Sequence, residues 1–172
     1  MTGKVANGVH TGDLRYFLLS TPADALAIDS PDGELLTKDD VVRMYGASAA
    51  TAGKRLDALH FQGGATRGYQ TADGKYHVLV RLFRFSTAAG AKTWLTSLRP
   101  VTGWKAFPVS GYPDFKAYDI PVDPTLAAAR LQVVGFRGDV FFEVNVFGQP
   151  PVDHNVLIDR LRKQIARLDT GS

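Results

Sequence analysis

Cysteine is absent from the 172-residue sequence. Its absence excludes disulfide bonds, thiol nucleophiles and thiolate metal sites. It does not identify the compartment, because bacterial secreted proteins without disulfides are common and a core of this size can be stable without a covalent link.

Long apolar runs and a strong charge imbalance are also missing. No run approaches the roughly 20 apolar residues that a membrane-spanning helix needs. The net charge is only +3, and basic residues gather only in the last predicted helix. These residues are Arg160, Arg162, Lys163 and Arg167. We interpret this cluster as a solvated helix face and expect no nucleic-acid partner.

Common catalytic and ligand-binding motifs are not found. The four histidines are far apart and show no HExxH spacing, so we expect no metal site. GxSxG, GxxxxGK[ST] and GxGxxG are absent, so we expect no catalytic residue and no cofactor. The tripeptide Arg137-Gly138-Asp139 spells an adhesion motif, but it falls where a hairpin turn is needed, and we interpret it as a turn.

The most informative stretch is Lys75 to Leu98, which reads as the second strand of a hairpin followed by a helix. Asp73-Gly74 is a turn signal, since glycine accepts the positive φ of tight turns. Side chains alternate along the strand, giving one nearly pure apolar face and one mixed face. The apolar face carries Tyr76, Val78, Val80, Leu82 and Arg84, and the mixed face carries His77, Leu79, Arg81, Phe83 and Phe85. Ser86 is the predicted N-cap of the helix.

A similar unit recurs near the C-terminus. A hairpin turning at Gly138 precedes a strand with Val140, Phe142 and Val144 on one face, and a helix begins after Pro150-Pro151. We therefore predict an α+β fold, an antiparallel sheet built from two β-hairpin-plus-helix (ββα) units with helices mainly on one face. The units span residues 64–99 and 129–168. They are either a duplication or two uses of a common architecture.

The rest of the chain reads as connections and short elements. Residues 1–12 are predicted to be a flexible tether, and residues 13–170 a single domain. Residues 13–19 form a strand or an early helical turn, and residues 20–36 form a loop. Thr37 caps a helix, and a second helix follows before Gly63-Gly64. Residues 100–124 are dense in proline, glycine and aromatics, with short edge strands.

Two groups of residues are candidates for a ligand or partner surface. The mixed strand faces combine aromatic and charged side chains, a composition typical of binding surfaces. They carry His77, Arg81, Phe83, Phe141, Glu143, Asn145 and Phe147. The alternative is that the N-terminal helices pack against this face and Arg81 pairs with Glu143. The aromatic loop, with Trp104 and Tyr112, either lines a small-molecule or glycan groove or plugs an end of the sheet.

Several of these stretches together resemble a known group of proteins. They are HTGDLRYFLL, LLTKDDVVRMYG, LDALHFQGGATRGYQTADGKYHVLVRLFRFSTAAGAKTWL, FRGDVFFEVNVFG and LIDRLRKQIARL. Their order is similar to that in actinobacterial, Streptomyces-type cell-envelope lipoproteins of unknown function. The order of hairpins and helices also looks like Mog1/PsbP-type domains and kinase sensor ectodomains. The signal peptide and lipidated cysteine of such precursors are absent here, as in a trimmed portion or in a cytoplasmic relative.

The leading hypothesis is a non-enzymatic, envelope-exposed binding or accessory domain. The resemblance implies an extracytoplasmic location, a protein, peptide or glycan partner at the envelope, and membrane contact only through an anchor outside this chain. One alternative is an enzyme with an unrecognised site near His77 and Glu143. Another is a structural or assembly module.

Overall fold

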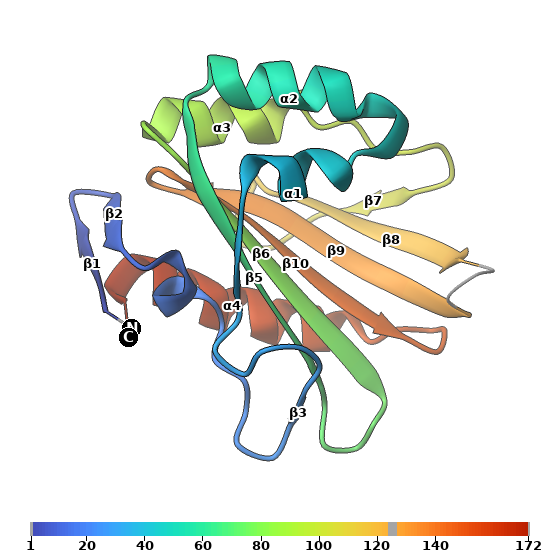
Figure 1. The fold of residues 1–172 in the computed structure, drawn as a ribbon. Coiled ribbons are helices and arrows are strands. Elements are labelled where there is room, and N and C mark those ends of the chain that lie inside the picture. The colour runs from blue at the N-terminus through green and yellow to red at the C-terminus, as the bar shows by residue number, and fades with distance from the viewer. Residues whose placement is uncertain (1, 124–126, 172) are drawn as a thin grey trace.

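In a computed structural model, which describes residues 2–123 and 127–171, the chain forms an antiparallel sheet packed against helices on both faces (Figure 1). Eight strands of this part of the chain form the main sheet, in the order β3-β5-β6-β10-β9-β8-β7, with β4 also paired to β5. They are β3 (Leu26–Ala27), β4 (Glu34–Leu36), β5 (Phe61–Gln70), β6 (Tyr76–Phe85), β7 (Lys105–Phe107), β8 (Lys116–Asp123), β9 (Ala128–Arg137) and β10 (Val140–Gly148). The predicted α+β class with an antiparallel sheet is confirmed.

The centre of the sheet is formed by the two predicted hairpins. β5 and β6 turn at Gly74, with φ +69°, and β9 and β10 turn at Gly138, with φ +53°. The second strands, β6 and β10, pair with each other, and Val144 lies opposite Val80. The two purely apolar strand faces therefore form one continuous apolar side of the sheet.

The helices divide between the two sides of the sheet. α4 (His154–Thr170) packs its buried leucines on the apolar side, in one core cluster with Val80, Phe142 and Val144. α1 (Lys38–Arg43), α2 (Ala49–Ala58) and α3 (Ala88–Ser97) lie on the other side, which we call the mixed face.

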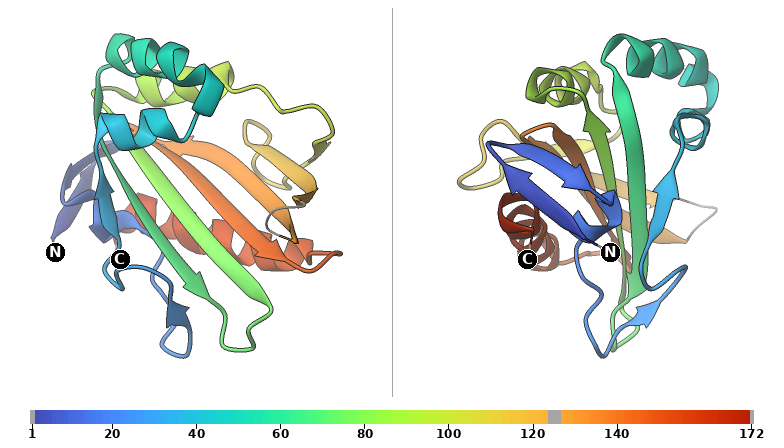
Figure 2. Two further views of the ribbon diagram at one scale, coloured as in Figure 1. Left: turned by 45° about the vertical axis from the view of Figure 1, so that its right-hand side comes forward. Right: turned by 60° about the vertical axis from the view of Figure 1, so that its left-hand side comes forward.

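The sequence left two arrangements open for the mixed face, and in the structure helices cover it at one end of the strands. Phe83, Phe85 and Phe141 place three large rings at one end of the mixed face, and Trp94 and Leu95 of α3 bury them. The two ββα units therefore place their helices on opposite sides of the sheet. α1, α2 and α3 gather over this end only, so on the mixed face the strands continue beyond them without a covering helix (Figure 2).

The N-terminus differs from the predicted flexible tether. β1 (Gly3–Ala6) and β2 (Val9–Gly12) pair as a hairpin, and a 3-10 helix, η1 (Leu14–Phe17), follows. His10 is 3% exposed, because its side chain bonds to Asp139 and to the carbonyl of Leu168. The hairpin thus joins the β9–β10 turn to the end of α4.

Local sequence signals locate most helix boundaries correctly. Thr37 and Asp40 form the predicted capping box at the start of α1, each side chain accepting from the other residue's backbone N–H. α3 is capped by Thr87, one residue after the predicted Ser86. The predicted loop of residues 20–36 contains the short strands β3 and β4, which pair with β5. None of the helices in the described ranges is long and apolar enough to cross a membrane.

Buried Tyr69 makes the stability of the fold sensitive to alkaline pH. Burial raises the pKa of Tyr69 to about 12, whereas the unfolded chain releases this proton near about pH 10. Between these values the unfolded state binds fewer protons than the folded state, so stability falls as pH rises. We expect Tyr69→Phe to remove up to about 3 kcal/mol of this loss. Urea unfolding of both proteins at neutral pH and across this window measures the difference, and parallel curves would contradict the assignment.

A candidate ligand pocket on the mixed face

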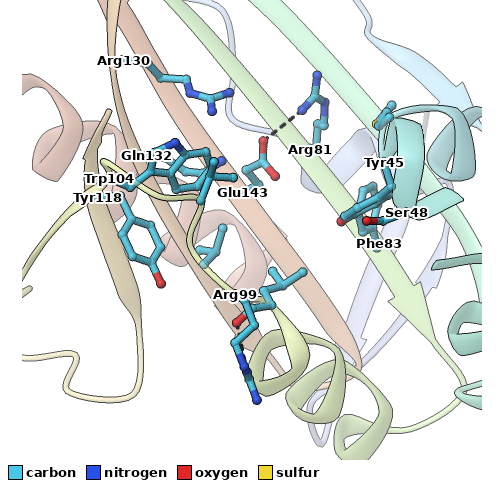
Figure 3. Close-up of a pocket in the computed structure, with 14 residues that line it drawn as sticks. Tyr45, Ser48, Arg81, Phe83, Arg99, Trp104, Tyr118, Arg130, Gln132 and Glu143 are labelled. Atoms are coloured by element: carbon cyan, nitrogen blue, oxygen red, sulfur yellow. Dashed lines mark hydrogen bonds and ion pairs between the residues drawn. The ribbon is translucent and has the colours of Figure 1, made fainter. Parts of the chain in front are cut away.

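A pocket of about 420 Å³ opens on the mixed face beside the covering helices (Figure 3). We call it the first pocket. Its walls come from the α1–α2 connection, from three central strands, and from β8 with the segment before β7. The lining residues used below are Tyr45, Ser48, Arg81, Phe83, Arg99, Trp104, Tyr118, Arg130, Gln132 and Glu143.

The floor of the first pocket is a hydrogen-bonded row of polar side chains across three strands. Arg81 Nη1 donates to Glu143 Oε1 at 2.9 Å, and Asn145 Nδ2 donates to the same oxygen at 2.7 Å. Gln132 Nε2 donates to Asn145 Oδ1 at 3.2 Å. The register places Arg81 opposite Glu143 and Gln132 opposite Asn145, so the sheet itself aligns the row.

This polar row is largely withdrawn from solvent. Asn145 is fully buried, and Gln132 and Glu143 are 7% and 9% exposed. Buried polar groups normally require partners, and here they partner one another. The mutual bonds hold each planar group in one orientation, so the donors and acceptors facing the pocket are already positioned.

Aromatic side chains form the pocket walls. The rings of Trp104 and Tyr118 lie with centroids 5.5 Å apart, and the Arg130 guanidinium lies 5.3 Å from the Trp104 ring. Across the pocket, Tyr45 packs edge-on against Trp94. Burial, together with the Glu143 carboxylate, raises the pKa of the Tyr45 phenol above its ordinary value. Tyr45 is therefore a neutral hydrogen-bond donor at physiological pH.

The charge of the first pocket is positive. Three arginines, Arg81, Arg99 and Arg130, and one carboxylate, that of Glu143, are among the described lining residues. Arg81 pairs with Glu143, so Arg99 adds a positive charge that no carboxylate among the described lining residues offsets. Such a lining favours an anionic group on the ligand.

The predicted surface residues separate into four places. Arg81, Glu143 and Trp104 line the first pocket, and Asn145 lies fully buried in its polar row. Phe141 is fully buried and stacks on Phe83 at 5.5 Å, so its prediction as a surface residue is corrected. Phe141 is buried because it lies at the end of the mixed face that α3 covers. Phe83 lies at the same end but also forms part of the pocket wall.

His77 and Tyr112 lie away from the first pocket. His77 is exposed and lines a second pocket, described below. Tyr112 stacks on Phe115 at 4.9 Å and packs with the core under α4, on the opposite side of the sheet from Trp104. The aromatic loop of residues 100–124 is therefore divided between the two sides of the sheet, with Trp104 and Tyr118 at the first pocket and Tyr112 on the side of α4.

A second pocket of about 600 Å³ lies farther along the mixed face. Its lining includes His77, Leu79, Phe147 and Ile28, with Lys75 and Asp29 as charged members. The enzyme hypothesis placed His77 near Glu143, but these residues line different pockets.

Most residues that line the first pocket were not among the predicted site residues. Arg130 and Gln132 share one face of β9 by simple alternation, so the strand pattern contained this signal. Tyr118 alternates in the same way along β8. Tyr45 and Ser48 carried no such signal, because their position depends on where α1 and α2 dock. Among the described residues, no group of three or more histidine, aspartate or glutamate side chains could hold a metal ion.

Comparison with known proteins gives a likeness of fold. No family model matches the sequence, and no curated protein matches it. Among solved structures, the chain is similar to the extracellular domain of PknH from Mycobacterium tuberculosis, with a TM-score of 0.50 and 12% identity. The match covers 84% of this chain and 81% of that one. At this identity the likeness concerns the fold alone.

Proposed function

We propose that this chain is a binding domain without catalytic activity, which acts outside the cytoplasm and holds a small ligand in the first pocket. The observation that carries the proposal is the buried row of Gln132, Asn145, Glu143 and Arg81 on the floor of an open pocket. Preorganised polar groups among apolar and aromatic walls are typical of ligand sites.

A contribution to stability does not by itself explain why this polar row is present. A buried ion pair can often be replaced by apolar residues of similar volume with little loss of stability or even a gain. At the covered end of the same face, the sheet residues are apolar, with Phe83 and Phe141 stacked beneath α3. A polar row where the face opens to solvent is therefore better explained by recognition of a ligand.

An extracytoplasmic location has support from two sources. The fold is like that of an extracellular domain, although at 12% identity this likeness transfers no ligand. The sequence also resembles actinobacterial envelope lipoproteins, and the lipid anchor and envelope location are parts of the proposal that come from this resemblance.

The dye 1-anilinonaphthalene-8-sulfonate is a suitable probe because it joins aromatic rings to an anionic group. We expect saturable one-to-one binding to the folded protein. Trp104→Ala should weaken binding by about tenfold, the loss expected when one aromatic wall is removed. Dye fluorescence measures the affinity, and thermal unfolding confirms that the variant is folded.

The matched control is Tyr112→Ala, which removes an aromatic residue of the same loop on the opposite side of the sheet. It should leave the dye affinity unchanged even if it lowers the melting temperature. Equal losses in both variants, or no saturable binding, would contradict a ligand site in the first pocket.

A further inference from the structure

We propose that the ligand is an anionic amphiphile, a molecule with one acidic head group and one apolar chain, which occupies both pockets of the mixed face. The head group lies at the arginines of the first pocket, and the chain lies in the second pocket. The inference rests on the proposed function, because it assigns a ligand class to the same site.

The two pockets adjoin along the strands. Arg81 lines the first pocket and Leu79 the second, and they are two residues apart on the same face of β6. This spacing corresponds to about 7 Å along a strand. Arg130 lies between the pockets, with its guanidinium 5.3 Å from the Trp104 ring and 5.7 Å from the Phe147 ring. A single elongated ligand can therefore contact both.

The second pocket suits an apolar chain. Leu79 and Phe147 are partly exposed on the sheet, and Ile28 is 49% exposed beside them. Apolar surface of this kind gains free energy when a chain covers it, at about 25 cal/mol per Å². Covering it requires no hydrogen bond from the ligand.

The strand pairing argues against an extended peptide. β6 pairs with both β5 and β10, and β10 pairs with both β6 and β9. Their backbone donors and acceptors are used within the sheet, so a peptide on this face would have no strand backbone to pair with. A hydrocarbon chain has no polar backbone to satisfy.

The charge of the first pocket selects the head group. Arg81 pairs with Glu143, and Arg99 adds a positive charge that no carboxylate among the described lining residues offsets. Arginine is well suited to carboxylates and phosphates, because its planar donors bind two oxygens together. The shared chemistry is therefore an acidic head, carried by a free fatty acid or by a phospholipid with one chain.

Displacement of the dye tests this ligand class with dodecanoate, used below its micellar concentration. We expect dodecanoate to displace the dye one-to-one. Dodecanol has the same chain without the charge, and butanoate has the same head with a short chain. Each should bind at least about tenfold more weakly, since each loses one of the two contributions. Dodecyl phosphate in the same assay distinguishes a phosphate head from a carboxylate head.

The variant Ile28→Asp examines the chain position. It places a carboxylate on the second pocket, so dodecanoate should bind about tenfold more weakly while dye affinity changes little. The control Asp29→Asn alters another residue of the same pocket without placing a charge beneath the chain, and should not weaken dodecanoate.

The outcomes separate this inference from the proposed function. Dye binding at Trp104 without displacement by dodecanoate would overturn the amphiphile and leave the proposed function standing. Absence of both dye and dodecanoate binding would contradict both. Equal affinity for dodecanoate and dodecanol, an unaffected Ile28→Asp variant, or displacement by an acidic peptide but not by dodecanoate would also overturn the amphiphile.

Discussion

Replacement of His10 by alanine is expected to lower the free energy of unfolding by about 3–4 kcal/mol. His10 Nδ1 lies 2.6 Å from Asp139 Oδ1, and Nε2 lies 2.8 Å from the Leu168 carbonyl oxygen. The ring therefore joins two groups that are far apart in the sequence. Removing it leaves the buried Asp139 side chain, 5% exposed, without this side-chain partner. The ring also packs edge-on against Phe17 at 4.9 Å.

Urea unfolding measures the effect, and Val9→Ala is the matched control. Val9 is the neighbouring residue in β2 but is 50% exposed, so its truncation should cost about 0.5 kcal/mol. A loss below about 1 kcal/mol for His10→Ala would show that the N-terminal hairpin is not bound to the domain in this way.

Replacement of Arg81 by methionine should cost about 2–3 kcal/mol of stability, since it leaves the Glu143 carboxylate without its cation. The Arg81 side chain is 25% exposed and that of Glu143 is 12% exposed, so solvent reduces the penalty from that of a fully buried pair. Asn145 continues to donate to Glu143, which limits the loss further.

The double variant Arg81→Met with Glu143→Gln serves as the control for this prediction. The glutamine keeps an oxygen that accepts from Asn145 and removes the unpaired charge, so most of the lost stability should return. Dye affinity should be low in both the single and the double variant, because both lack Arg81, which lines the first pocket. Chemical unfolding and dye titration of the same samples separate the role of Arg81 in stability from its role in ligand binding. Restored affinity in the double variant would assign the pair to stability alone.

Strand alternation in the sequence predicts much of the candidate site. The two-residue period assigned His77, Arg81, Glu143 and Asn145 to mixed faces, and both turn glycines adopt the positive φ expected of them. The pairing of Arg81 with Glu143 follows once β6 and β10 are neighbours. The polar row is therefore a direct consequence of residue order and antiparallel register.

Long-range packing determined what the sequence did not predict. Whether α3 covers the apolar or the mixed face depends on Trp94 meeting Phe83 and Phe85, which no local pattern specifies. Likewise, His10 gains its partners only after the β9–β10 turn and the end of α4 come together. The opposite positions of Trp104 and Tyr112 depend in the same way on how their loop crosses the edge of the sheet.

The most direct test of the central claim, that the first pocket is the ligand site, is an NMR titration of the ¹⁵N-labelled protein with the dye. The chain has two tryptophans, so its spectrum contains two indole N–H signals. Trp104 lines the pocket, whereas Trp94 is 1% exposed, on the side of α3 that faces the sheet. We predict that the Trp104 indole signal shifts saturably while the Trp94 signal stays in place. Saturable binding that leaves the Trp104 signal unchanged would contradict the claim.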